Sequence, residues 1–203
     1  MTPDFGILVL AAGQSSRFGS DKLFAKMPDG QPLIAHSLAP LRAMAKRYQL
    51  KLCVVTRADN YELNNYLTEK EIPHTICTDA HLGMGHSIAH GIKSNPLWQG
   101  WMIALADMPS LTTNIIESLI THIIQNPHQV VRPSILKEEK EIPLHPVYFP
   151  QFYKLKLSQL TGNNGAKELI QQQKLINVEN TEYLIDVDTP EDLQQIKPEE
   201  SNE

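Results

Sequence analysis

Cysteine is scarce in this sequence, and basic residues do not outnumber acidic ones. Only two cysteines occur among 203 residues, and both Cys53 and Cys77 lie next to apolar residues. This pattern predicts small buried side chains and argues against a disulfide framework. The formal net charge is -5 and the isoelectric point is near 5.9, which argues against broad binding to nucleic acid or to a membrane surface.

Long apolar runs and several familiar catalytic patterns are also missing. No stretch approaches the roughly 18 apolar residues of a membrane helix, and the start "MTPDFG" lacks the basic residues of a signal peptide. We therefore expect a cytoplasmic protein. The motifs contain no Ser-His-Asp or Cys-His arrangement, and the histidines form no cluster with zinc-ligand spacing.

Short apolar runs alternate with amphipathic segments over the first two thirds of the chain. The expected strands are 5–11, 50–56, 73–78, 101–106 and 129–133. The expected helices are 32–48, 60–70, 85–94 and 113–125. Nearly all-apolar strands separated by helices are typical of a parallel sheet covered on both faces. We predict a Rossmann-like α/β fold with a mostly parallel sheet and helices on both faces.

The remaining third is less regular. We expect a charged loop at 134–144, a strand at 145–149, helices at 151–159 and 165–172, and a strand at 175–179. A last helix should begin at Pro190. No repeat or linker divides the chain, so we expect one domain over 1–197 and a polar tail at 198–203.

The stretch "ILVLAAGQSSRFGSDKL" joins the first expected strand to a loop rich in glycine, hydroxyls and positive charge. Backbone N–H groups of residues 13–19 would lie at the rim of the sheet, where an anion can bind. Ser15 and Ser16 add donors, and Arg17 and Lys22 add charge. The spacing matches neither a P-loop nor G-x-G-x-x-G. The alternative is a glycine turn with surface charges.

The full pattern L-A-A-G-x-S-S-R-F-G-x-D-K-L resembles the loop of the nucleotidyltransferases related to molybdenum cofactor guanylyltransferase and cytidylyltransferase. Further motifs follow in the order and approximate spacing of that family: "LGMGHSIAHGI" (82–92), "ALADMPSL" (104–111), "HPVYF" (145–149), "LTGNNGAKEL" (160–169) and "DVDTPEDL" (186–193). The resemblance implies a fold of the nucleotide-diphospho-sugar transferase type. It also implies transfer of a nucleoside monophosphate from an NTP to the phosphate of molybdopterin, with release of pyrophosphate.

The resemblance implies a nucleotide site built from the first loop and the second motif. Its expected members are Leu10, Ala11, Ala12, Gly13, Ser15, Ser16, Gly83, Gly85 and Ser87. Arg17 would hold the leaving phosphates, and Lys22 would hold the α-phosphate. Glycines at 83 and 85 would let a base or ribose approach the backbone closely, although an ordinary turn into a helix is the alternative.

Asp107 follows the strand 101–106 directly, at the edge where ligands bind in parallel sheets. A carboxylate there suits Mg²⁺ bound to a triphosphate, because Mg²⁺ takes few carboxylates together with phosphate oxygens and water. The alternative is a cap for the next helix, but residues 112–114 can already supply that cap. The resemblance implies that Asp188 joins Asp107 as a metal ligand, and Asp186 ranks below it.

The acceptor site is expected around the later motifs. His145, Asn163 and Asn164 are the candidates, with 134–144 as a mobile loop nearby. A histidine just before a strand is alternatively a packing or hydrogen-bonding residue. The resemblance also implies transient contact with a molybdoenzyme apoprotein.

The base specificity is expected to depend on position 12. Ala12 resembles the cytidylyltransferase branch, whereas a glycine there resembles the guanylyltransferase branch. The extra methyl group narrows the space near the base and favours CTP, by a margin of about 1–3 kcal/mol. Two alternatives stay open: a nucleotidyltransferase of the same fold that uses GTP or another phosphate acceptor, and a non-catalytic carrier of cofactor or nucleotide.

Overall fold

The computed structural model describes residues 4–14 and 21–178. Eight strands of this part form one sheet in the order β3-β2-β1-β4-β7-β5-β6, with β8 beside β5. The strands are β1 (Gly6–Leu10), β2 (Lys51–Arg57), β3 (His74–Cys77), β4 (Gly100–Leu105), β5 (Val131–Lys137), β6 (Lys140–Pro143), β7 (Val147–Pro150) and β8 (Lys174–Asn177). β1 to β4 pair in parallel, and β7 runs antiparallel to both β4 and β5.

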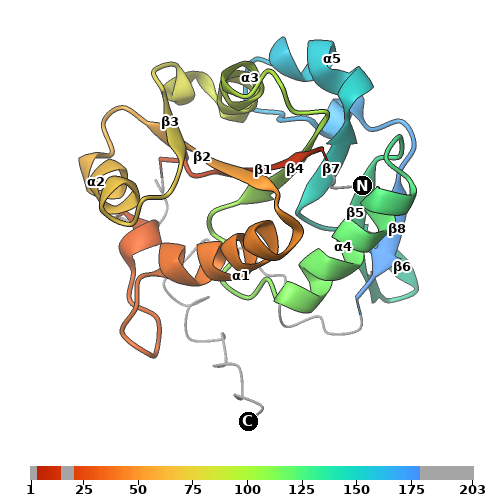
Figure 1. Cartoon of the computed structure of the whole chain (residues 1–203), viewed down its shortest axis with the longest axis horizontal. Coiled ribbons are helices and arrows are strands. Elements are labelled where there is room, and N and C mark those ends of the chain that lie inside the picture. Colours follow the sequence, from red (N-terminus) through yellow and green to blue (C-terminus); the bar gives the residue numbers. More distant parts are fainter. Residues whose placement is uncertain (1–3, 15–20, 179–203) are drawn as a thin grey trace.

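Helices cover both faces of this sheet (Figure 1). They are α1 (Leu33–Tyr48), α2 (Tyr61–Glu69), α3 (Met84–Ser94), α4 (Thr113–Gln125) and α5 (Lys154–Ser158). α1, α2 and α4 pack on one face, and α3 and α5 pack on the other. The prediction of an α/β fold with a mostly parallel sheet in a single domain is confirmed. The predicted boundary between 197 and 198 falls outside the described residues.

Alternation along β1 explains why the sheet has a core on each side. Ile7 and Val9 belong to the cluster beneath α1 and α4, whereas Leu8 belongs to the cluster beneath α3. α3 lies close to the sheet because Gly91 faces it: a Cβ there would be 2.7 Å from both Leu8 methyl carbons and 2.8 Å from a Val55 methyl carbon. The core beneath α3 is therefore tightly packed against the strand that leads into the first loop.

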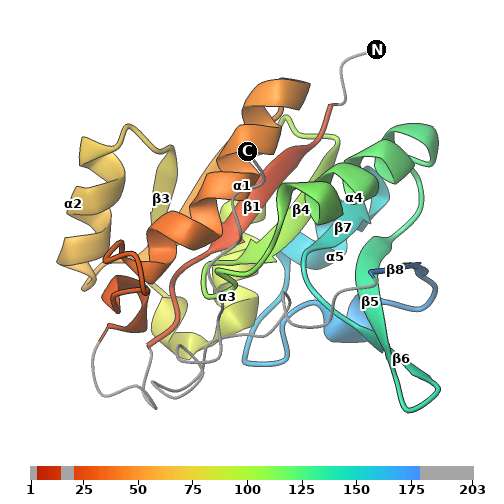
Figure 2. The ribbon, with the colours of Figure 1, turned by 90° about the horizontal axis from the view of Figure 1, so that it is seen from below.

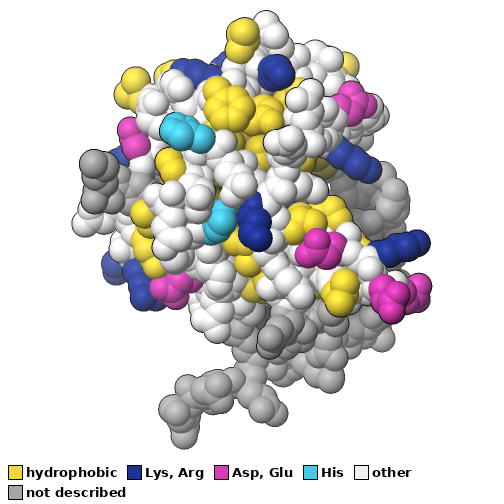
Figure 3. Space-filling view, turned by 90° about the vertical axis from the view of Figure 1, so that its right-hand side faces the viewer, with side chains coloured by type: hydrophobic (Ala, Val, Ile, Leu, Met, Phe, Trp, Pro, Cys, Tyr) yellow, Lys and Arg dark blue, Asp and Glu magenta, His cyan; other side chains and the backbone are white. Residues whose placement is uncertain are grey.

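The cysteine prediction is confirmed, since Cys53 and Cys77 are both free and buried. Within the described ranges, no helix combines the length and the apolar character needed to cross a membrane. Figure 3 shows the side of the molecule on which β5, β6 and β8 lie. Basic and acidic side chains are dispersed over the coloured part of this face, and they form no broad basic surface there.

Two predictions for the last third are wrong. Residues 134–144 are not a loop: β5 continues to Lys137, turns through Glu138 and Glu139 at φ 49° and 64°, and returns as β6. All four residues of β6 are exposed at the edge of the sheet, so charged residues fit this hairpin (Figure 2). The predicted helix 165–172 is only a 3-10 turn at Lys167–Leu169, because the chain becomes extended at Ile170.

Candidate active site

The first loop begins where the backbone of β1 leaves the sheet. Ala11 N–H donates to Val55 O at 2.9 Å, so the parallel ladder continues one residue beyond β1. Ala11 and Ala12 are both buried, and Gly13 and Gln14 are exposed. The predicted residues Ser15, Ser16 and Arg17 lie outside the described residues, and so does Asp188.

A short 3-10 helix, η1 (Lys22–Phe24), carries Lys22 back to the edge of the sheet. Asp21 caps it: Oδ1 accepts from Leu23 N–H at 3.1 Å, and Oδ2 accepts from Asn60 Nδ2 at 2.5 Å. Asn60 is only 5% exposed and caps α2 in turn, because its Oδ1 accepts from Leu63 N–H at 3.1 Å. The first turns of η1 and α2 are therefore joined by a hydrogen bond between their capping side chains, and this fixes the backbone beside Lys22.

Lys22 forms an ion pair with Asp107, with Nζ 2.5 Å from Oδ2. The two side chains are only 13% and 21% exposed. Asp107 stands just beyond β4, where Ala106 N–H donates to Leu10 O at 3.0 Å and ties this end of β4 to β1. The other carboxylate oxygen, Asp107 Oδ1, is buried and accepts no hydrogen bond from the described residues. A buried unpaired carboxylate oxygen is costly and is well suited to a cation.

The cap of the following helix does not come from Asp107. Thr112 Oγ1 accepts from Ile115 N–H at 3.4 Å at the start of α4. This agrees with the expectation that residues 112–114 contain the cap.

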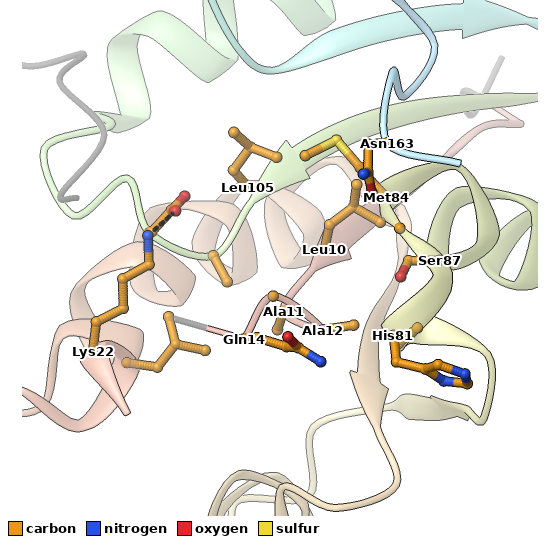
Figure 4. Close-up of a pocket in the computed structure, with 16 residues that line it drawn as sticks. Leu10, Ala11, Ala12, Gln14, Lys22, His81, Met84, Ser87, Leu105 and Asn163 are labelled. Carbon is orange, nitrogen blue, oxygen red and sulfur yellow. Dashed lines mark hydrogen bonds and ion pairs between the residues drawn. The ribbon is translucent and has the colours of Figure 1, made fainter. Parts of the chain in front are cut away.

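A cavity of about 320 Å³ opens at this edge of the sheet (Figure 4). Most of the predicted residues that the structure describes line it: Leu10, Ala11, Ala12, Gly13, Lys22, Gly83, Ser87, Asp107 and Asn163. Lys22 and Leu105 lie on one side, and Met84, Ser87 and Asn163 lie on the other. Gln14 and His81 also line the cavity but were not predicted, since Gln14 occupies a variable position of the first-loop pattern and His81 lies directly before the second motif.

The structure gives the glycines of the second motif a packing role. Gly83 has φ 119°, and a Cβ on it would collide with Gly162 and Asn163. A Cβ on Gly85 would lie 2.5 Å from Thr161 O, and Gly85 N–H donates to Gly162 O at 2.8 Å. The loop 161–163 thus fills the space that the missing side chains leave. Gly83 still lines the cavity, whereas Gly85 does not, so its nucleotide contact stays a prediction without support from its position.

A second cavity, of about 470 Å³, adjoins the first and shares Leu10 and Met84 with it. Two of the three predicted acceptor residues, His145 and Asn164, line this cavity, and Asn163 lines the first. Asn163 and Asn164 are neighbours in the chain, so one loop borders both cavities.

The environment of His145 keeps its ring neutral at pH 7. Its Nδ1 atom is buried and has no hydrogen-bond partner among the described residues. Burial, and secondly the positive charge of Arg132, lower the pKa of His145 to about 4. Arg132 lines the same cavity and was missed from the sequence, where the only signal is one charge inside the apolar run "QVVRPSIL".

A metal at Asp107 would need further ligands. Within residues 4–14 and 21–178, no group of three or more His, Cys, Asp or Glu side chains could hold a metal ion. Phosphate oxygens, water and residues beyond those ranges are the other ligands that a hard cation accepts.

The fold and the cavity at the carboxyl edge of its parallel strands define an α/β domain of the nucleotide-binding type. The chain belongs to the MobA-like NTP transferase domain family, whose sequence model matches residues 7–177. It is therefore a member of a family of nucleotidyltransferase enzymes, as the sequence motifs predicted.

Two named relatives are similar to this chain over most of its length. The purine catabolism protein PucB of Bacillus subtilis is 27% identical over 202 residues, which cover 93% of each chain. A probable molybdenum cofactor guanylyltransferase of Rhodopirellula baltica is 28% identical over 148 residues, which cover 72% of this chain and 68% of the relative.

Solved structures show the same fold at lower identity. Rv0371c of Mycobacterium tuberculosis superposes with a TM-score of 0.78 at 18% identity, covering 96% of this chain and 97% of its own. A manganese complex of Rv0371c superposes with a TM-score of 0.73 at 17% identity, covering 95% of this chain and 97% of its own. A CMP:2-keto-3-deoxy-manno-octonic acid synthetase complexed with CTP superposes with a TM-score of 0.73 at 14% identity, covering 95% of this chain and 96% of its own.

Proposed function

We propose that this protein transfers a nucleoside monophosphate from an NTP, with CTP preferred, to the phosphate of a molybdopterin-type acceptor and releases pyrophosphate. One observation carries the proposal: the Lys22–Asp107 pair at the wall of a cavity formed by the first loop and the α3 start. This pair supplies an ammonium for phosphate oxygens and a carboxylate for a cation at the same edge of the sheet.

The reaction needs little from the protein beyond positioning and charge neutralisation. An oxygen of the acceptor phosphate attacks the α-phosphorus, the bond to the oxygen bridging the α- and β-phosphorus breaks, and pyrophosphate leaves with that electron pair. Lys22 would hold the α-phosphate, and Arg17 would hold the leaving phosphates. A phosphate acceptor is already ionised at neutral pH, so no general base is required.

Asp107 and Asp188 would hold Mg²⁺. Asp107 fits this task because its buried Oδ1 accepts no hydrogen bond from the described residues. Bound Mg²⁺ would neutralise charge on the phosphates. The manganese complex of Rv0371c supports the use of a divalent cation in this fold.

Ala12 supports CTP as the preferred nucleotide. It is buried, lines the cavity, and adds a methyl group where a glycine would leave more room for a purine. The relative from Rhodopirellula baltica, a probable guanylyltransferase, favours GTP as the second candidate.

The test is pyrophosphate release with Mg²⁺ and molybdenum cofactor, comparing CTP, GTP, ATP and UTP at equal concentration. A CTP preference would support the proposal, and a GTP preference would retain the reaction but overturn the role of Ala12. Nucleotide binding without pyrophosphate release from any of the four would favour another acceptor or a carrier.

Matched variants separate the site from the fold. Lys22→Met and Asp107→Asn should each lower kcat at least about 100-fold, the usual cost of losing one group that stabilises developing charge. Lys46→Met and Asp29→Asn make the same changes on the exposed surface and should leave kcat unchanged. Near-native rates in either site variant would refute the assignment.

A further inference from the structure

The floor of the second cavity is a row of side chains from four neighbouring strands. Leu10, Ile103 and Val147 come from β1, β4 and β7, and Arg132 comes from β5 at the end of the row. Ile103 pairs with Val147 across β4 and β7, and the pairing of Val131 with Tyr148 places Arg132 beside Val147. The floor therefore changes from aliphatic to cationic with increasing distance from the first cavity.

Arg132 is held in place but its charge is not compensated within the described residues. Its Nε donates to Leu144 O at 2.7 Å, which fixes the plane of the guanidinium. No described carboxylate forms an ion pair with it, and no acidic residue lines the cavity. Burial lowers the pKa of Arg132. Arg132 is half-buried, so its charge is only partly hydrated, and an anionic ligand in the cavity would compensate it.

A second unpaired polar group borders the same cavity. His145 Nδ1 is buried without a partner among the described residues. The charges of Arg132 and Asp107 act on the pKa of His145 in opposite directions, so the ring lies within range of both. Lys167 adds another positive charge to the lining. The cavity thus extends from the Asp107 region toward a cationic end, between largely apolar walls.

We propose that Arg132 is a specificity-determining residue for the acceptor, and that its guanidinium holds an oxyanion of a ligand whose flat ring packs its face on Leu10, Ile103 and Val147. This inference rests on the proposed function, and it takes the second cavity as the acceptor site because the predicted acceptor residues His145 and Asn164 line it. The planar guanidinium matches the two oxygens of a carboxylate or phosphate, and its fixed orientation limits the entropy lost on binding.

Two fluorescent probes of similar shape test the inference: pterin-6-carboxylate, which is anionic, and 6-hydroxymethylpterin, which is neutral. Titration of the wild-type protein should show the anion binding about tenfold or more tightly, as a charge-assisted pair predicts. Arg132→Gln should abolish this preference, and Arg132→Lys should keep part of it. Arg42→Gln, the same change on the exposed face of α1, should behave as wild type.

Equal binding of the two probes to wild-type protein, or no binding of either, would overturn the inference. So would an anion preference that survives in Arg132→Gln. CTP binding and thermal unfolding of each variant check that the protein is folded. If the probe preference follows Arg132 but no nucleotide yields pyrophosphate, the proposed function fails while the anion site stands.

Discussion

The buried imidazole of His145 should make the stability of the protein depend on pH. In the folded chain its pKa is lowered to about 4 by burial and by Arg132, from an ordinary value of 6.5. Between these two pH values only the unfolded chain binds the proton, so the folded state loses stability as pH falls from 6.5 to 4. The loss amounts to about 2 kcal/mol at pH 5 and about 3 kcal/mol below pH 4.

The perturbation is His145→Gln, which removes the titrating group but keeps a polar side chain. Urea unfolding at pH 7.5 and pH 5.0 gives the free energy of unfolding at each pH. The wild-type protein should lose about 2 kcal/mol more than the variant between the two values. His128→Gln is the control, because His128 is exposed, and its pH dependence should equal that of the wild type.

The comparison uses the difference between two pH values, so any constant cost of replacing His145 cancels. Identical pH dependence in wild type and His145→Gln would refute the reasoning. It would mean that the ring binds a proton equally well in the folded and unfolded chains.

Three further predictions concern the packing around the site and its need for a cation. Asn60→Ala removes the cap of α2 and the hydrogen bond to Asp21, so the free energy of unfolding measured in urea should fall by about 2 kcal/mol. The kcat should also fall, because the backbone beside Lys22 loses its support. Unchanged values of both quantities would contradict this. Gly91→Ala places a methyl group against Leu8 and should cost about 1–3 kcal/mol in the same assay, whereas a neutral effect would mean that α3 moves freely away. Chelation by EDTA should stop pyrophosphate release and added Mg²⁺ should restore it, and release that continues in EDTA would refute the need for a divalent cation.

The parallel half of the fold could be predicted because its strands are short apolar runs bounded by helices. Such runs must be buried on both faces, and the carboxyl ends of parallel strands meet at one edge. That reasoning alone brings Asp107 close to the first loop, and the structure places it 2.5 Å from Lys22. Asp21 could not be interpreted this way, because its contact with Asn60 joins residues far apart in the sequence.

The part of the fold after residue 133 was harder to predict, because an exposed strand at the edge of a sheet has a composition similar to that of a loop. Residues 134–144 are rich in charge, yet they form the β5–β6 hairpin, where the turn residues Glu138 and Glu139 adopt positive φ. Gly83 and Gly85 have a packing role that the sequence could not reveal. Their lack of a side chain is required by the loop 161–163, a contact that no local pattern reveals.

Both cavities use the first half of the chain, but most of the second cavity's lining comes from after residue 130. Apart from Asn163, the residues around the first cavity lie between Leu10 and Asp107, whereas the positive charges at the second cavity, Arg132 and Lys167, come from later in the chain. Under the proposed function, substitutions of Arg132 or Lys167 should therefore alter acceptor recognition without changing the described residues of the first cavity. Nucleotide binding and acceptor choice would then be separable by substitution within one domain.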